Sequence, residues 1–437
     1  MLARVPRVRG AIRAASRGGP SPGSRVVMPA AFPSLPASWG EVICRGRGAY
    51  DVTGDLAARR IADGGNVRWL DPNGSDAANG LTEGTAKQTW AGVRATFALN
   101  TPVTVFIKPG TYSAWGAASV YQNANLIAVG GRARFSAAVT GLSWAANGTY
   151  PNVYQATVAA PYAVVDEAQL DAERIATWLT LQASLAAVDA APGSYYASGG
   201  VLYVRTADSR APDASLLVLP TGALNGVTLL DPSVFASGID WIGGQRAFTA
   251  QAAAAFTAFD CRFLYGETGG YYANSCLDSV LVNCEAHGIV NGDGYDYTAV
   301  GKHLELRCRG RRNGAPWAAS SGINNASSAH GATVVRLSGY YGNSDGPNVA
   351  DAVSSYSFNA GCRIETSRDD SGPTQQCNVV ADSSGGGAGA KIWLLDCGLG
   401  GAGIAADLRP SLAADRIYVR NSPYGRTPSG AGVVEAW

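Results

Sequence analysis

The feature that most constrains this chain is a loose repeat that begins near residue 226 and continues almost to the C-terminus. Each unit has a short apolar core, then a small or polar residue, then a turn containing glycine or asparagine; the segments are VTLLD, FTAFDCRF, LDSVLVNCEA, KHLELRCRG, ATVVRLSGYY, NAGCRIE, KIWLLDCG and DRIYVRN. Cys261, Cys284 and Cys308 follow one another at nearly equal intervals. A fixed period of this length, in the twenties, is typical of a solenoid.

The repeated units favour strands stacked in a parallel coil. Short apolar cores, without helices to cover a flat sheet, favour a β-helix over a leucine-rich repeat. The same interval separates Cys397 from Asn421, whereas the step from Cys308 to Ser338 is longer, which predicts an insertion in that turn. At this period about eight rungs fit between residues 226 and 421. Each rung would pack on its neighbours at a strand spacing of about 4.8 Å.

The cysteines fit this coil as small interior side chains. They are Cys44, Cys261, Cys276, Cys284, Cys308, Cys362, Cys377 and Cys397. None forms a C-x-x-C pair and the chain has only three histidines, so no metal site is expected from their spacing. Most lie at the ends of apolar runs, where buried free thiols act as small hydrophobic groups. A framework of disulfides is the alternative.

Composition argues against two classes of partner. The formal net charge is +1 and 15% of the residues are charged, which gives no reason to expect nucleic-acid binding. The sequence contains no apolar run of about 18 residues, the length that indicates a membrane-spanning helix. We therefore expect neither nucleic-acid binding nor membrane insertion.

Residues 1–65 form the first region of the chain. They hold six arginines before the first acidic residue, Glu41, and they lack the apolar segment of a secretory signal. Prolines at positions 6, 20, 22, 29, 33 and 36 prevent a single helix. We predict an extended arm that docks onto a partner and attaches the protein to a particle. A transit peptide is the alternative.

Residues 66–142 are expected to form the N-terminal cap and the first rungs of the coil. VRWLD and VTVFIKPG are expected strands, PNGSDAANG is an expected turn, and residues 86–100 have helical spacing. The string LDPNGSDAANGLTEGTAKQTW, followed by KPGTYS, resembles the opening of right-handed parallel β-helix proteins of the pectate-lyase-like superfamily. These include polysaccharide lyases and phage tailspike or tail-fibre proteins. The resemblance implies that the helix caps the N-terminal end of the coil.

Residues 143–221 are expected to form a small inserted accessory subdomain rich in strands. APGSYYASGGVLYVRTADSRAPDASLLVLP, residues 191–220, resembles an insertion of the same proteins and is typical of hairpins. Residues 164–188 have the strongest helix propensity, although the resemblance implies short strands there. The predicted fold is all-β: a right-handed parallel β-helix with an N-terminal capping helix, this insertion, and further rungs over residues 222–437.

Carboxylates in expected turns are the first candidates for chemistry. The stretch NGDGYDY, residues 291–297, contains Asp293 and Asp296, and Glu285 and Asp345 lie on expected neighbouring rungs. Glycoside hydrolysis needs two carboxyl groups about 5 Å or about 6.5–9.5 Å apart, and these four residues could supply them. The alternatives are aspartates that only hydrogen-bond within a glycine-rich turn, or a calcium site, which the spacing disfavours. No other cofactor is predicted.

Arginines and aromatic residues are the candidates for glycan binding. Arg307 and Arg309 flank Cys308 in LELRCRGRRNG and would leave the same outer face of a strand if Cys308 points inward. Such a pair could hold the carboxylates of uronic acids, as a lyase requires, or form a solvated face. Rings that could stack on sugars, or pack inside the coil, are those of Tyr295, Tyr297, Trp317 and Tyr341.

One enzyme class of this fold is excluded by the order of its motifs. Polygalacturonases of the family carry NTD, DD, GHG and RIK in that order. This chain has NSDG at residues 343–346 and Asp369-Asp370, but no histidine follows His330. The histidine step is therefore missing.

The resemblance implies a phage-type tail fibre or tailspike that recognises a cell-surface polysaccharide and could depolymerise it. Such a protein would be a homotrimer in the virion, used in host attachment, with its arm bound to other tail or virion proteins. A free polysaccharide lyase or glycoside hydrolase, which would be secreted, is the alternative. A structural virion protein without a ligand is the third interpretation.

Overall fold

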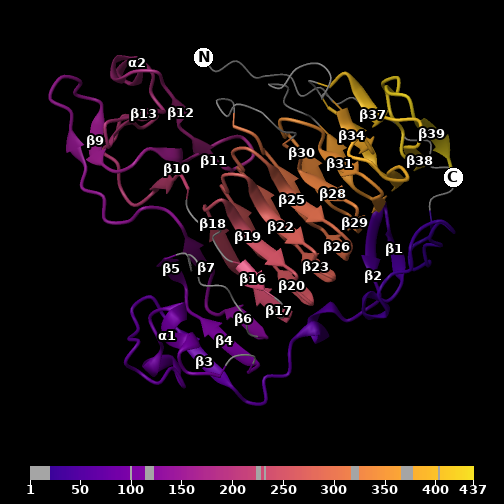
Figure 1. The fold of residues 1–437 in the computed structure, drawn as a ribbon, viewed down its shortest axis with the longest axis horizontal. Coiled ribbons are helices and arrows are strands. Elements are labelled where there is room, and N and C mark those ends of the chain that lie inside the picture. The colour runs from indigo at the N-terminus through magenta and orange to yellow at the C-terminus, as the bar shows by residue number, and fades with distance from the viewer. Residues whose placement is uncertain are drawn as a thin grey trace, which may run out of the picture.

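The computed structural model describes residues 20–98, 101–113, 123–222, 228–230, 233–315, 324–365, 377–401 and 404–437. Three long parallel sheets run through most of this length (Figure 1). We call the twelve-stranded sheet I, the nine-stranded sheet II and the eight-stranded sheet III. From residue 233 onward the chain visits sheets I, II and III in turn and then returns to sheet I one rung further along. This path is a parallel β-helix.

The strands of the three sheets are short. Sheet I contains β3 (Val67–Leu70), β4 (Val103–Ile107), β6 (Ala124–Ala128), β17 (Ser233–Ser237), β20 (Ala255–Phe259), β23 (Asp278–Val282), β26 (Lys302–Leu306), β29 (Thr333–Leu337), β32 (Tyr356–Ala360), β35 (Lys391–Leu395), β38 (Arg416–Arg420) and β39 (Val433–Ala436). Sheet II contains β5 (Gly110–Ser113), β7 (Ala133–Ser136), β18 (Ile239–Ile242), β21 (Arg262–Leu264), β24 (Glu285–His287), β27 (Arg309–Arg311), β30 (Tyr340–Gly342), β33 (Arg363–Glu365) and β36 (Gly398–Gly400). Sheet III contains β16 (Thr228–Leu230), β19 (Arg246–Gln251), β22 (Gly269–Asn274), β25 (Asp293–Thr298), β28 (Ser327–His330), β31 (Val349–Ala352), β34 (Cys377–Asp382) and β37 (Ala406–Pro410). In the described part of the chain, the eight sheet I strands from β17 to β38 confirm the predicted number of rungs.

A ladder of left-handed residues forms the corner between sheets I and II. The residue directly after each sheet I strand from β17 to β38 has a positive φ. These residues are Gly238, Asp260, Asn283, Arg307, Ser338, Gly361, Asp396 and Asn421. Left-handed backbone is costly for most residue types, and here the parallel hydrogen bonds of both adjacent strands hold it in place. The position recurs in every rung and therefore defines the register of the coil.

Cysteines occupy the next position of this ladder, which points inward. Cys261, Cys284, Cys308, Cys362 and Cys397 are buried there, and all eight cysteines of the chain are free and buried. Burial raises the pKa of the Cys276 thiol to about 12, and it raises the pKa of Cys284 well above its usual range. The packing role predicted for the thiols is confirmed. The sequence spacing aligned Ser338 and Asn421 with the cysteines, and this register was wrong by one residue. Both residues are left-handed and occupy the position of Arg307, which precedes Cys308.

The N-terminal segment is packed against the coil and is not an extended arm. Residues 20–61 lie along the outer face of sheet I, and they contain η1 (Ala37–Trp39), β1 (Val42–Gly46), β2 (Ala49–Val52) and η2 (Leu56–Arg59). Phe32, Trp39 and Tyr50 share one apolar cluster with outward residues of sheet I, such as Phe358 and Trp393. The hairpin of β1 and β2 is seen beside β29 in Figure 1. The prediction of an extended arm is wrong for this part, because its apolar side chains cover an apolar sheet face. Residues 1–19 lie outside the described residues.

Two small sheets project from the side of the coil between β7 and β17 (Figure 1, upper left). One contains β10 (Pro161–Leu170), β11 (Ala176–Trp178) and β15 (Leu216–Pro220); the other contains β8 (Ala145–Ala146), β9 (Tyr154–Thr157), β12 (Thr180–Leu181), β13 (Ser194–Ser198) and β14 (Val201–Arg205). The helix propensity of residues 164–188 is overridden, since β10 pairs with both β11 and β15, and only α2 (Leu185–Ala190) is helical there. Trp178 and Leu217 pack with Leu264 and Tyr265 of the coil, so the small sheets cover part of the outer face of sheet II.

The N-terminal end of the coil holds the remaining helices. The predicted helix over residues 86–100 is reduced to α1 (Trp90–Arg94), preceded by the short η3 (Glu83–Thr85). Thr89 caps α1 by accepting a hydrogen bond from the Gly92 backbone. Trp90 and Val93 are buried in the same apolar core as β3 and β4. Within the described residues, no helix has the length and apolar character needed to span a membrane.

Candidate functional site

The stretch NGDGYDY is a strand and not the predicted turn. The turn ends at Gly292, where a Cβ atom would lie 2.1 Å from the Thr268 carbonyl oxygen, and β25 begins at Asp293. Tyr295 and Tyr297 are buried in the coil, so Asp296 between them faces outward. Ser328, the register partner of Asp296, donates to Asp293, which places the Asp293 carboxyl group on the same outer side of sheet III.

Three ionisable side chains come together on this face, and we call them the outer acid cluster: Asp293, Asp296 and His330. One side-chain ligand atom from each lies within 4.8 Å of the other two. Asp296 Oδ1 lies 3.7 Å from His330 Nε2 and accepts a hydrogen bond of 3.2 Å from Thr298 Oγ1. The side chains of Asp296 and His330 are 21% and 41% exposed, so both can meet a ligand from solvent.

Asp293 is the anchored member of the cluster. Its Oδ1 accepts hydrogen bonds from the Asn325 backbone nitrogen at 2.7 Å and from Asn325 Nδ2 at 2.8 Å. Its Oδ2 accepts a hydrogen bond of 2.5 Å from Ser328 Oγ. These three bonds fix the carboxyl group behind Asp296, which leaves Asp296 as the carboxyl group that faces solvent.

Burial and mutual repulsion give the outer acid cluster an unusual proton affinity. Burial, followed by the neighbouring charge of Asp296, raises the pKa of Asp293 to about 7. Burial also raises the pKa of Asp296, and His330 opposes that shift. Two carboxyl groups this close together titrate as a pair. The cluster can therefore give and accept a proton in the pH range where most enzymes work.

The same cluster is the group of residues that could hold a metal ion in the described part of the chain. Its two carboxylates and one imidazole are ordinary donors for a divalent cation. However, both oxygens of Asp293 already accept hydrogen bonds, which reduces the oxygen atoms left for a calcium ion that takes six to eight ligands. The arrangement fits proton transfer better than a calcium site.

The other predicted carboxylates lie elsewhere. Glu285 faces outward on sheet II, 3.5 Å from Arg309 Nη1 and 3.8 Å from Arg311 Nη2. Asp345 is buried in the turn after β30, where its backbone nitrogen donates to the Asn313 carbonyl oxygen. Glu285 therefore lies on a different sheet from Asp293 and Asp296, whereas Asp345 lies in the turn that joins sheet II to sheet III. Asp369 and Asp370 lie outside the described residues.

The predicted arginines line a trough along the corner between sheets I and II. Arg307, Arg309, Arg311 and Arg363 surround this hollow of about 570 Å³, whose other lining residues are Cys308, Ser338, Gly339, Tyr340 and Gly361. Arg307 is a left-handed corner residue and Arg309 begins β27, so they do not alternate along one strand as predicted. Both still reach the same hollow.

The predicted sugar-stacking tyrosines are interior residues. Tyr295, Tyr297 and Tyr341 are fully buried, and their prediction as glycan contacts is wrong. The cause is the inward direction of their positions: Tyr295 packs edge-on against Phe263, and Tyr297 stacks on His303 at 4.5 Å. Burial lowers the pKa of His303 to about 3, so that histidine is neutral. Trp317 lies outside the described residues.

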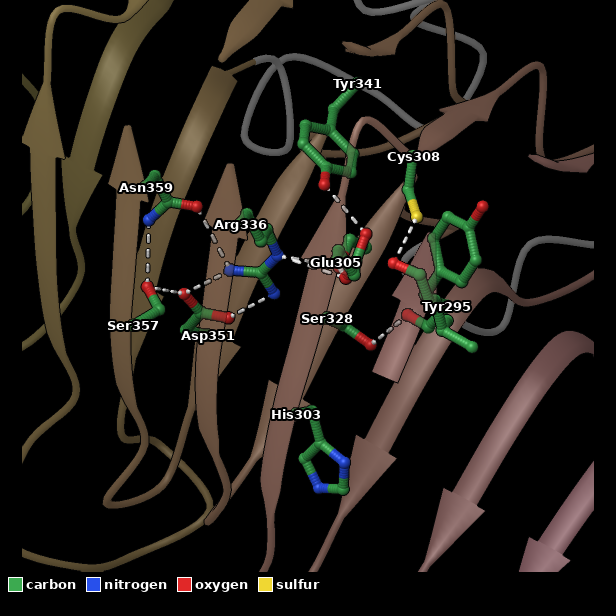
Figure 2. Close-up of polar contacts among 12 residues, drawn as sticks. Tyr295, His303, Glu305, Cys308, Ser328, Arg336, Tyr341, Asp351, Ser357 and Asn359 are labelled. Atoms are coloured by element: carbon green, nitrogen blue, oxygen red, sulfur yellow. Dashed lines mark hydrogen bonds and ion pairs between the residues drawn. The ribbon is translucent and has the colours of Figure 1, made fainter. Parts of the chain in front are cut away.

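The coil interior contains a charged network that the sequence analysis missed. Arg336 lies between Glu305 and Asp351 in Figure 2, and all three side chains are fully buried. Arg336 Nη2 is 3.0 Å from Asp351 Oδ1, and Arg336 Nε is 3.5 Å from Glu305 Oε1. Ser327 and Tyr341 also donate to the two Glu305 oxygens. We call Glu305, Arg336 and Asp351 the inner charged network; its burial excludes it from substrate contact.

Comparisons with known proteins return fold likenesses only. No family model matches the sequence, and no curated protein matches it significantly. The structure of pectate lyase Pel9A is similar over 86% of this chain and 79% of its own, with 10% identity and a TM-score of 0.44. A glycoside hydrolase is similar over 85% and 96%, with 9% identity and a TM-score of 0.41. The tailspike protein gp49 of Pseudomonas phage LKA1 is similar over 82% and 73%, with 12% identity and a TM-score of 0.23. The parallel β-helix assignment therefore rests on this chain's own sheets.

Proposed function

We propose that this protein is a phage-type tailspike or tail-fibre protein that binds a cell-surface polysaccharide and hydrolyses it by acid–base catalysis at Asp296. The outer acid cluster carries this proposal. Glycosidic bonds resist cleavage until the leaving oxygen is protonated, and a carboxyl group whose pKa is raised toward neutrality is the usual proton donor. Asp296 has a raised pKa, faces outward and is partly exposed.

Each residue of the cluster has a separate role in the proposed reaction. Asp296 contacts the glycan and transfers the proton to the glycosidic oxygen. Asp293 is a positioning residue: held by Asn325 and Ser328, it keeps a second carboxyl group beside Asp296, and that neighbouring charge favours the protonated form of Asp296. His330 lies 3.7 Å from Asp296 and orients it. As Asp296 gives its proton to the glycosidic oxygen, the bond from that oxygen to the anomeric carbon breaks, water adds to that carbon, and the proton that the water releases returns to Asp296.

The biological setting belongs to the same proposal. We propose a homotrimer in the virion, attached through the N-terminal region, with α1 capping the coil and residues 143–221 acting as an accessory subdomain. The parallel strands support a role in holding an extended polymer, because outward side chains recur at a regular spacing along the coil. A free secreted lyase or hydrolase of the same fold remains the alternative, and its distinguishing property is activity as a monomer without a particle.

To test the proposal, the purified protein is incubated with host envelope polysaccharides. The chain length of the polysaccharide and the ultraviolet absorbance of unsaturated sugar ends are then measured. Shortening without unsaturated ends supports hydrolysis, and loss of that activity in Asp296→Asn assigns it to the cluster. Shortening with unsaturated ends identifies a lyase and overturns the hydrolase proposal. Unchanged chain length with retained binding rejects an enzyme. A parallel sample with a chelator decides whether the cluster works with a metal ion, and the mass in solution tests the trimer.

A further inference from the structure

The arginine trough is a second surface, separate from the outer acid cluster. It runs along the corner between sheets I and II, whereas the cluster lies on sheet III. Four of its nine lining residues are arginines, and none of the nine is acidic. Ser338, Gly339 and Gly361 also line it. The trough is therefore a hollow that presents positive charge to solvent.

Its arginines keep donor capacity for a ligand. Arg309 is 56% exposed and makes one long contact of 3.5 Å with Glu285. Arg363 is 68% exposed and pairs through Nη2 with Glu365 at 2.5 Å. A guanidinium group has five N–H donors, so one such contact leaves other donors of each arginine for a further acceptor. By contrast, Arg132 and Arg262, further along the same face, each donate from Nε to buried Asp240 at 2.7 Å. The positive charge of that end is compensated inside the protein.

The trough has two walls and a regular spacing. The hairpin of β1 and β2 supplies one wall through Asp51, and the loop before β11 supplies the other through Glu173, which lies 3.7 Å from Arg311. Arg309, Tyr340 and Arg363 are register partners on three successive strands. Arg309 and Arg363 therefore repeat at two rungs, about 10 Å along the coil. An extended polymer lying along the coil would meet guanidinium groups at that interval.

We propose that this trough binds an acidic polysaccharide, whose carboxylate or sulfate groups pair with Arg309 and Arg363 while a sugar ring lies over Tyr340. The proposal rests on the proposed function and adds to it the charge class of the glycan and a binding surface distinct from the outer acid cluster. Planar guanidinium groups bind carboxylates and sulfates through paired hydrogen bonds, and Tyr340 supplies a flat surface between them. Arg363 already lies over the Tyr340 ring, 5.8 Å from its centroid.

The experiment measures binding in the Asp296→Asn background, so that cleavage cannot alter the probe. The probes are fluorescent oligogalacturonate for carboxylates, fluorescent dextran sulfate for sulfates, and neutral dextran. The double variant Arg309→Gln/Arg363→Gln is expected to weaken binding of the acidic probe by about a hundredfold, at roughly tenfold for each lost charge-assisted pair. Arg25→Gln is the matched control, because Arg25 is 68% exposed and pairs with one glutamate, as Arg363 does.

Each outcome decides the proposal. Tight, salt-sensitive binding of oligogalacturonate or dextran sulfate that the double variant loses, and Arg25→Gln keeps, supports it, and the tighter probe names the acidic group. Equal binding of neutral dextran, or acidic binding that survives in the double variant, overturns it. If the Asp296→Asn protein binds neither acidic probe while the wild-type protein still cleaves host polysaccharide, the trough proposal is contradicted and the proposed hydrolase is not. Retained binding without any cleavage contradicts the proposed hydrolase alone.

Discussion

Two clusters of carboxyl groups begin on consecutive strands of the chain, in successive rungs, but lie on opposite sides of the coil wall. The outer acid cluster places Asp293 and Asp296 of β25 on the outside of the coil, and the inner charged network places Glu305 of β26 on the inside. Burial raises the pKa of Glu305, as it does for Asp293 and Asp296. Only the inner network contains an arginine between its carboxyl groups.

The difference teaches what separates a structural acid from a reactive one in this fold. Inside the coil, every charged group of the network has a partner, and the serine, tyrosine and asparagine side chains around Arg336 complete it (Figure 2). Outside, the two aspartates lie close together with no arginine between them, and the Asp296 side chain is partly exposed to solvent. A raised pKa alone does not identify a site; a raised pKa together with exposure does.

The largest effect is expected from breaking the inner network. Arg336→Met removes the cation between Glu305 and Asp351 and leaves buried carboxyl groups without their partner. Removing one partner of a buried ion pair typically costs about 3–5 kcal/mol of the free energy of unfolding. Denaturant unfolding followed by circular dichroism measures the loss. The triple variant Arg336→Met/Glu305→Gln/Asp351→Asn should recover part of it, and a single variant as stable as wild type would contradict the assignment.

The outer cluster should show the reverse pattern, with activity lost and stability kept. Asp296→Asn removes the carboxyl group that faces solvent, and loss of a general acid typically lowers the rate by about 10²–10⁴-fold. The matched control is Asp382→Asn, on the same sheet, where the side chain accepts a hydrogen bond from the Ser384 backbone. Rates of polysaccharide shortening compare the two variants. An Asp296→Asn protein with full activity would show that the cluster is not catalytic.

The same contrast explains how much the sequence predicts. Sheet I follows from apolar cores such as KHLEL and TVVRL, because their side chains alternate between the interior and a face that the N-terminal segment covers. The strands of sheet III could not be predicted from the sequence, because GGYYAN, DGYDYT and SSAH are rich in residues with low strand propensity. These strands form because the neighbouring rungs supply their backbone hydrogen bonds and their inward tyrosines pack in the coil.

The site was predictable only in part for the same reason. The aspartate pair lies in one short stretch and could be proposed from the sequence alone. His330 reaches it from the next rung, after an insertion between β27 and β28 that hides the register. Ser328 and Asn325 lie in the same rung as His330, and no sequence pattern indicated that they would contact Asp293. Arg336 could not be predicted as interior, because a charged residue is normally placed outside until its partners are known.

The dependence of stability on pH separates the two clusters further. The pKa of Asp293 is about 7 in the folded protein and close to its ordinary value of 3.8 in the unfolded chain. The folded state therefore holds a proton that the unfolded state releases, so Asp293 lowers the free energy of unfolding progressively as pH rises from about 4 to 7. Asp293→Asn should flatten this decline relative to wild type and to Asp382→Asn. Unfolding free energies measured at intervals across that range test this, and parallel curves would contradict it.

The smallest predicted effect concerns a single hydrogen bond to the cluster. Ser328 Oγ donates to Asp293 Oδ2 and so favours the ionised form of that carboxyl group. Ser328→Ala should raise the pKa of the pair, and because activity requires the shared proton, the alkaline decline in rate should move to higher pH by a fraction of a unit. Stability should fall by about 1 kcal/mol, the usual value of one hydrogen bond. Rate–pH profiles of the two proteins give the shift, and a profile displaced to lower pH would show that Ser328 instead stabilises the protonated pair.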